Sequence, residues 1–68
     1  MKILLNNLSE EIAGKDQMTI RELLTYKKYS FKMLVIKVNN EIIKTPQYET
    51  TIVKEGDDVI ILHLMSGG

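Results

Sequence analysis

The chain has 68 residues and no cysteine, which predicts one small domain and excludes disulfides, thiolate metal sites and cysteine nucleophiles. Nine Lys and Arg residues balance nine Asp and Glu residues, and this formal net charge of zero argues against a nucleic-acid-binding protein. No segment has the ~20 apolar residues of a membrane span, and the N-terminal apolar run is too short for a signal peptide, so we expect a cytoplasmic protein that contacts no membrane.

The first expected element is a strand over residues 2–6, in which alternation turns Leu4 to the face opposite its neighbours. Asn6-Asn7 suits a turn, because asparagine tolerates left-handed backbone and bonds its own main chain. Residues 10–13 are then expected to form a short second strand that pairs with the first.

A helix is expected to begin at Thr19. Thr19 and Glu22 have the spacing of a capping box, in which each side chain accepts a hydrogen bond from the backbone N–H of the other residue. Ile20, Leu23 and Leu24 follow as one apolar stripe. The helix is expected to span about ten residues, too few for stability alone, so it must pack against a sheet.

Further strands are expected in the second half of the chain. Residues 33–38 are mostly β-branched and apolar, and Asn39-Asn40 provides a hairpin turn into a short strand over residues 41–43. Pro46 excludes a central strand at its position. Residues 51–54 are expected to pair briefly before the next turn.

The final strand is expected over residues 58–64. It and the first strand are the most apolar, so we expect both to be central and parallel, with the helical segment as the crossover. One amphipathic helix across one face of a mixed sheet is an α+β arrangement of the β-grasp, or ubiquitin-like, kind. We expect residues 1–64 to form this domain and residues 65–68 to form a flexible C-terminal tail.

The final strand is apolar on both of its faces. A sheet covered by a helix on one side needs only one apolar face, yet Ile60, Leu62 and Leu64 form a second, to which Leu4 and Val35 can add. An exposed patch of this kind marks a partner surface, and we expect Leu4, Ile60, Leu62 and Leu64 to bind a partner. The alternative is that these residues fill the rim of a small core.

Most side chains capable of chemistry are interpreted as structural or solvated. His63 is the only histidine and has no acidic neighbour positioned for catalysis or metal binding. Glu10-Glu11 and Asp57-Asp58 are adjacent, so their side chains point to opposite faces, which favours solvated turn residues over an acid/base pair. Tyrosines and lysines interleave in residues 25–32 as in a base-stacking surface, but the zero net charge favours a helix end and loop anchors.

The chain ends in Met65, Ser66, Gly67 and Gly68 directly after the final strand. Because glycine has no Cβ, the last two residues can enter a slot too narrow for side chains. An extended tail reaches about 13 Å, at ~3.3 Å per residue, enough to enter a recessed site while the domain docks outside. The alternative is a frayed terminus. We expect the terminal carboxylate of Gly68 to be the reactive group.

Four segments of the chain match the sequence pattern of a known family: MKILLNN, TIRELL, VIKVNNEII and KEGDDVIILHLMSGG. Together they resemble the thiamine-biosynthesis sulfur carrier family, ThiS. The resemblance covers nearly the whole chain, although residues 9–17 and 27–32 match loosely and Leu62 stands where the family often has an aromatic. The small subunit of molybdopterin synthase shares the implied fold and tail but is usually longer.

The resemblance implies a carrier protein rather than an enzyme. A ubiquitin-activating-like adenylyltransferase of the ThiF type would use ATP and Mg²⁺ to form an acyl-adenylate at Gly68. Sulfur from a desulfurase system would then replace AMP and leave a terminal thiocarboxylate, which a thiazole synthase of the ThiG type would consume. The carrier itself would bind no cofactor and no metal.

Three other functions stay open from the sequence. The chain could be a sulfur carrier of the molybdopterin-synthase type, or a ubiquitin-like modifier conjugated to proteins through Gly68. It could also be an interaction module with no terminal chemistry. The same Gly-Gly terminus serves the first two, so the sequence does not identify the final acceptor.

Overall fold

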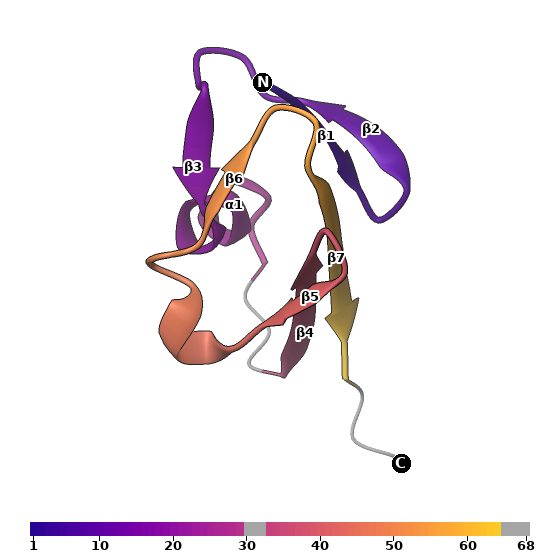
Figure 1. Cartoon of the computed structure of the whole chain (residues 1–68), viewed down its shortest axis with the longest axis vertical. Coiled ribbons are helices and arrows are strands. Elements are labelled where there is room, and N and C mark those ends of the chain that lie inside the picture. Colours follow the sequence, from indigo (N-terminus) through magenta and orange to yellow (C-terminus); the bar gives the residue numbers. More distant parts are fainter. Residues whose placement is uncertain (30–32, 65–68) are drawn as a thin grey trace.

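The computed structural model describes residues 1–29 and 33–64, which contain seven β-strands, one α-helix and one 3₁₀ helix. In chain order these elements are β1 (Lys2–Leu5), β2 (Leu8–Glu11), β3 (Gln17–Thr19), α1 (Ile20–Tyr26), β4 (Leu34–Val38), β5 (Glu41–Ile43), η1 (Thr45–Gln47), β6 (Ile52–Lys54) and β7 (Asp58–His63). Five strands form one mixed sheet in the order β2-β1-β7-β4-β5, and β3 pairs with β6 in a second sheet (Figure 1). This confirms the expected β-grasp arrangement.

The last strand, β7, lies in the middle of the five-stranded sheet. It runs parallel to β1, with Leu4 opposite Asp58, and antiparallel to β4, beginning with Leu34 opposite His63. The predicted parallel pairing of the first and last strands is therefore confirmed. In Figure 1, β7 starts near the end of the molecule that holds the N-terminus and points away from it.

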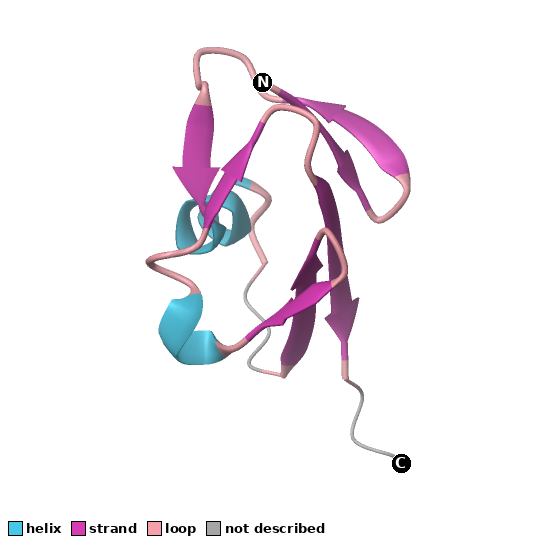
Figure 2. Ribbon diagram, in the orientation of Figure 1, coloured by secondary structure: helices cyan, strands magenta, loops and turns pink. Residues whose placement is uncertain are grey.

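The helix α1 covers one face of this sheet (Figure 2). Its buried side chains, Ile20, Leu23 and Leu24, are those of the predicted stripe. They belong to a single core with side chains from the strands and loops: Ile3, Leu5, Ile12, Met18, Ile36, Val38, Ile43, Tyr48, Val53, Val59 and Ile61. We call the face of the sheet that points to this core the inner face, and the opposite one the outer face.

Two asparagine pairs make the hairpin turns. Asn6 and Asn7 between β1 and β2 have φ values of 52° and 66°, and Asn39 and Asn40 between β4 and β5 have φ values of 50° and 72°. Two successive left-handed residues give the tight turn whose twist matches paired strands, and asparagine adopts this conformation more readily than most residues. Both turns were predicted, and both are confirmed.

The predicted capping box at the start of α1 is present. Thr19 Oγ1 accepts a hydrogen bond from the backbone N–H of Glu22 at 3.1 Å, and Glu22 Oε1 accepts one from the backbone N–H of Thr19 at 2.8 Å. The hydrogen bond from the Thr19 backbone is the main cause that lowers the pKa of Glu22, because it stabilises the ionised carboxylate.

The helix ends earlier than the predicted ten residues. It stops at Tyr26 because Lys28 takes a left-handed conformation, with φ of 61°. The backbone N–H of Lys28 then donates to the carbonyl of Thr25 at 3.1 Å, and that of Tyr29 donates to the carbonyl of Leu24 at 2.8 Å. This pair of bonds is a Schellman closure.

No helix in the described ranges is long and apolar enough to span a membrane.

Two strand assignments differ from the prediction. β2 begins at Leu8, whereas residues 10–13 were expected. β3 was not predicted at all; its residues lead directly into the helix and pair with β6 in the second sheet, with Thr19 opposite Ile52. A three-residue strand is too short to show a period of two, so its existence depends on a partner distant in sequence.

Asp57 is a further correction, because it is buried and only 6% exposed rather than solvated. Its Oδ2 accepts a hydrogen bond from the backbone N–H of Lys54 at 2.9 Å, and its Oδ1 accepts one from Asn39 Nδ2 at 3.2 Å. Asn39 Oδ1 in turn accepts from the backbone N–H of Asp58 at 2.9 Å. The Asp57–Asn39 pair therefore ties the start of β7 to the turn after β4.

Replacing Asp57 by Ala should lower the free energy of unfolding by about 2–4 kcal/mol, because two donors in a buried place lose their acceptor. The exposed Asp16→Ala serves as the control and should change stability by less than about 0.5 kcal/mol. Urea denaturation of both variants measures the difference. An Asp57→Ala protein as stable as the wild type would show that this network does not hold β7.

Candidate functional site

The predicted reactive tail, Met65, Ser66, Gly67 and Gly68, lies outside the described residues. The part of the site that the structure describes is the strand leading to this tail and the outer face beside it. Leu64, which follows β7, still pairs with the chain before β4, since its backbone N–H donates to the carbonyl of Met33 at 2.9 Å. The tail therefore starts from an anchored position.

The outer face is set by the register of the strands. Val35 lies opposite Leu62, and Lys37 lies opposite both Ile60 of β7 and Ile42 of β5. Residues directly opposite on neighbouring antiparallel strands point to the same face. Six apolar side chains on this face form what we call the outer apolar patch: Leu4, Val35, Ile42, Ile60, Leu62 and Leu64.

The outer apolar patch is accessible to solvent. Leu62 is 53% exposed and Leu64 50%, whereas Ile61, directly before Leu62, is 3% exposed on the inner face. Ile60 is half-buried, and Leu4 is exposed at the β1 side of the patch. An accessible group of this kind is not the rim of the core, and it is a candidate for partner binding. That a partner binds it stays a prediction.

Ile42 is the member of the outer apolar patch that sequence reasoning did not single out. It is 60% exposed. The signal was present, because a tight turn at Asn39-Asn40 fixes the β4–β5 register and so brings Ile42 beside Lys37. The expected short strand contained this residue, but its face was not worked out.

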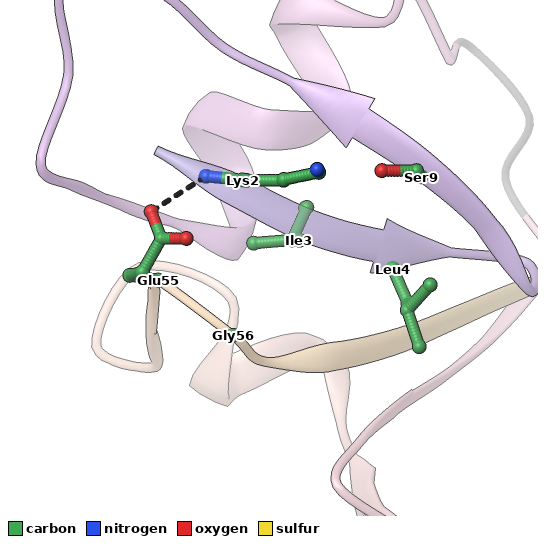
Figure 3. A pocket seen from close by; sticks show the side chains of 6 residues that line it. All are labelled: Lys2, Ile3, Leu4, Ser9, Glu55 and Gly56. Carbon is green, nitrogen blue, oxygen red and sulfur yellow. Dashed lines mark hydrogen bonds between the residues drawn. The ribbon is translucent and has the colours of Figure 1, made fainter.

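A shallow pocket adjoins the patch at Leu4 (Figure 3). It is lined by Lys2, Ile3, Leu4, Ser9, Glu55 and Gly56. The turn before β7 closes one side of it, because the backbone N–H of Lys2 donates to Glu55 Oε1 at 2.8 Å and that of Gly56 donates to the carbonyl of Lys2 at 2.8 Å. Gly56 has φ of 84°, a conformation that favours glycine.

The other candidate groups are engaged in structural contacts. The His63 ring meets the Tyr29 ring edge-on, with centroids 5.6 Å apart. Glu10 and Glu11 point to opposite faces: Glu10 Oε1 accepts from Lys27 Nζ at 3.0 Å, and Glu11 Oε2 lies 3.9 Å from the N-terminal ammonium. Within residues 1–29 and 33–64 no three His, Asp or Glu side chains gather as a metal site.

Comparisons with known proteins extend over the whole chain. The model of the ThiS family matches residues 3–68. The crystal structure of thiamine biosynthesis protein ThiS from Geobacter metallireducens is similar with a TM-score of 0.91 and 28% identity, covering 100% of both chains. The solution structure of a thiamine biosynthesis protein from the same organism has a TM-score of 0.84 and 28% identity, covering 100% of this chain and 88% of the other. None of the curated proteins matches the chain.

Replacing Leu62 by Asp should leave the fold intact and block partner binding. The carboxylate stays hydrated in the free chain, since this position is 53% exposed, but a partner covering the patch would have to desolvate it. We expect a melting temperature close to that of the wild type, and an affinity reduced at least about tenfold for the ThiF-type adenylyltransferase that the sequence resemblance implies as a partner. Calorimetric titration and thermal melts measure the two effects.

Leu8→Asp is the matched control, because Leu8 is 73% exposed and lies outside the outer apolar patch. It should bind the adenylyltransferase normally. A Leu62→Asp protein that unfolds, or that binds as tightly as the Leu8→Asp protein, would contradict the assignment of the outer apolar patch as the binding face.

Proposed function

The chain belongs to the ThiS family of small sulfur carrier proteins, and from this premise we propose that it carries sulfur for thiamine biosynthesis as a thiocarboxylate on Gly68. The observation that supports this most strongly is the family match, which continues through the tail to Gly68. The outer apolar patch supports it as well, because Leu62 and Leu64 offer a partner an accessible surface next to the root of that tail.

The first step makes the tail reactive. A chain-terminal carboxylate has an ordinary pKa of about 3.5, so it is ionised at neutral pH and can act as a nucleophile. One of its oxygens attacks the α-phosphorus of ATP, a C–O–P linkage forms, and pyrophosphate leaves. The adenylyltransferase holds the ATP and Mg²⁺, so the carrier acts as the substrate of this reaction. A cytoplasmic location, where ATP is available, is part of the same proposal.

The second step exchanges oxygen for sulfur. A free carboxylate is a poor acyl donor because its leaving group would be oxide, whereas the acyl-adenylate releases AMP. A hydrosulfide ion, released from the persulfide of the desulfurase system by a thiol reductant, attacks the acyl carbon. AMP leaves with the electron pair of the broken C–O bond, and loss of the sulfur-bound proton leaves a thiocarboxylate on Gly68. The thiocarboxylate then delivers this sulfur to the thiazole synthase.

The domain contributes position rather than a catalytic group. The Leu64–Met33 hydrogen bond anchors the tail at residue 64, so the four residues beyond it reach about 13 Å at ~3.3 Å per residue. A partner that covers Leu62 and Leu64 therefore has the root of the tail at the edge of its interface. The catalytic groups of the partner must therefore lie within the reach of the tail from that edge.

Deleting Gly68 should separate binding from reaction. The truncated chain ends in a carboxylate of the same kind but is up to ~3.5 Å shorter, and misplacement by about 1 Å already costs on the order of a hundredfold in rate. It should therefore lose ATP–pyrophosphate exchange with the adenylyltransferase. Because the outer apolar patch is unchanged, it should still inhibit exchange of the wild-type chain by competition.

Gly67→Val should also lose exchange, because a β-branched side chain does not fit a slot shaped for bare backbone. Neither change alters a core residue, so thermal melts of both variants should match the wild type and exclude misfolding as the cause. Normal exchange by the chain without Gly68 would reject the terminal-carboxylate mechanism and favour an interaction module.

A further inference from the structure

Lys37 lies inside the outer apolar patch, where a charged side chain is unusual. On β4 it is flanked by Ile60 of β7 and Ile42 of β5, the residues directly opposite it on either side. Such cross-strand neighbours have Cβ atoms about 4.5–5.5 Å apart. Val35, two residues earlier on the same strand, borders it along the strand. The aliphatic stem of Lys37 therefore lies among apolar side chains, and the residue is half-buried.

The ammonium of Lys37 has no counter-charge in the described part of the chain. The ion pairs within 4.0 Å there involve the N-terminus, Arg21 and Lys27. The acidic residue nearest in register on the same face is Asp58, two residues from Ile60 on β7. Its Oδ1 is buried and has no hydrogen-bond partner in the described structure, so this oxygen is not presented to Lys37. No group among residues 1–29 and 33–64 forms an ion pair with this ammonium, which leaves it to the solvent there.

A partner that covers the outer apolar patch removes this water. Burying an ammonium without a compensating group costs several kcal/mol per ion in a folded protein, so a wholly apolar partner surface would be rejected. A carboxylate placed over Lys37 would offset this cost. We propose that the adenylyltransferase presents a carboxylate opposite Lys37, and that this ion pair selects the correct partner on an otherwise apolar face; this rests on the proposed function.

A second copy of the chain fits this surface less well. A symmetric dimer formed through the outer apolar patch would bury the same patch of both copies in one interface. Both Lys37 ammonium groups would then lose water, and the apolar residues of the patch offer neither of them a carboxylate. Two like charges in one interface add a repulsion. The charge of Lys37 therefore favours a different protein, one with an acidic group at this point, over a second copy of the chain.

Lys37→Met tests the proposal through the direction in which it changes the KM for the carrier. Methionine keeps a similar apolar stem and removes the charge. If the partner has a carboxylate at this point, that carboxylate is left buried and alone, and the KM for the carrier in ATP–pyrophosphate exchange should rise at least about 30-fold. If the partner surface has no carboxylate there, methionine removes a desolvation cost and the KM should stay the same or fall. The latter result would overturn the proposal.

Two variants serve as controls. Lys37→Arg keeps the charge and should raise the KM by much less than Lys37→Met, whereas an equal loss in both would show that shape rather than charge matters and would overturn the proposal. Lys54→Met removes an exposed charge on β6, outside the outer apolar patch, and should have no effect. Thermal melts check that every variant is folded.

The outcomes separate this proposal from the one on which it rests. If the wild-type chain supports no exchange with the adenylyltransferase, the proposed function fails. If the wild-type chain and Lys37→Met exchange with the same KM, the carrier function stands and only the recognition of Lys37 by a carboxylate fails.

Discussion

The register of β7 is the constraint on which both the fold and the outer apolar patch depend. β7 pairs with β1 on one side and β4 on the other, and a shift by one residue would move Val59 and Ile61 out of the core and Ile60 into it. The two hairpin turns help to prevent this shift. Asn6 Oδ1 accepts a hydrogen bond from the backbone N–H of Ile61 at 2.7 Å, and Asn39, tied to Asp57, holds the start of the strand.

Under the proposed function, this arrangement separates recognition from reaction in a very small protein. The inner face of the sheet stabilises the domain with α1, while the outer face supplies an accessible apolar surface with Lys37 inside it. The reacting group is then needed only at the end of the chain, where it can enter a partner's active site.

Features set by neighbouring residues could be predicted from the sequence. The capping box of Thr19 and Glu22, the asparagine turns and the two faces of β7 all follow from local chemistry and alternation. Features that depend on distant contacts could not. β3 exists because β6 lies beside it, Asp57 is buried because Asn39 reaches it, and α1 ends early because Lys28 adopts a left-handed conformation that nothing in its chemistry requires. The outward direction of Ile42 is different, because the turn at Asn39-Asn40 fixes the β4–β5 register and so made it predictable.

The central claim, a thiocarboxylate on Gly68, is tested most directly by the intact mass of the chain isolated from cells together with its adenylyltransferase and desulfurase. The account predicts a gain equal to the replacement of one oxygen by sulfur, located by fragmentation at Gly68. Location is essential, because oxidation of any of the four methionines adds nearly the same mass. An unchanged Gly68 carboxylate, or Gly68 joined to lysines of other proteins, would contradict the account.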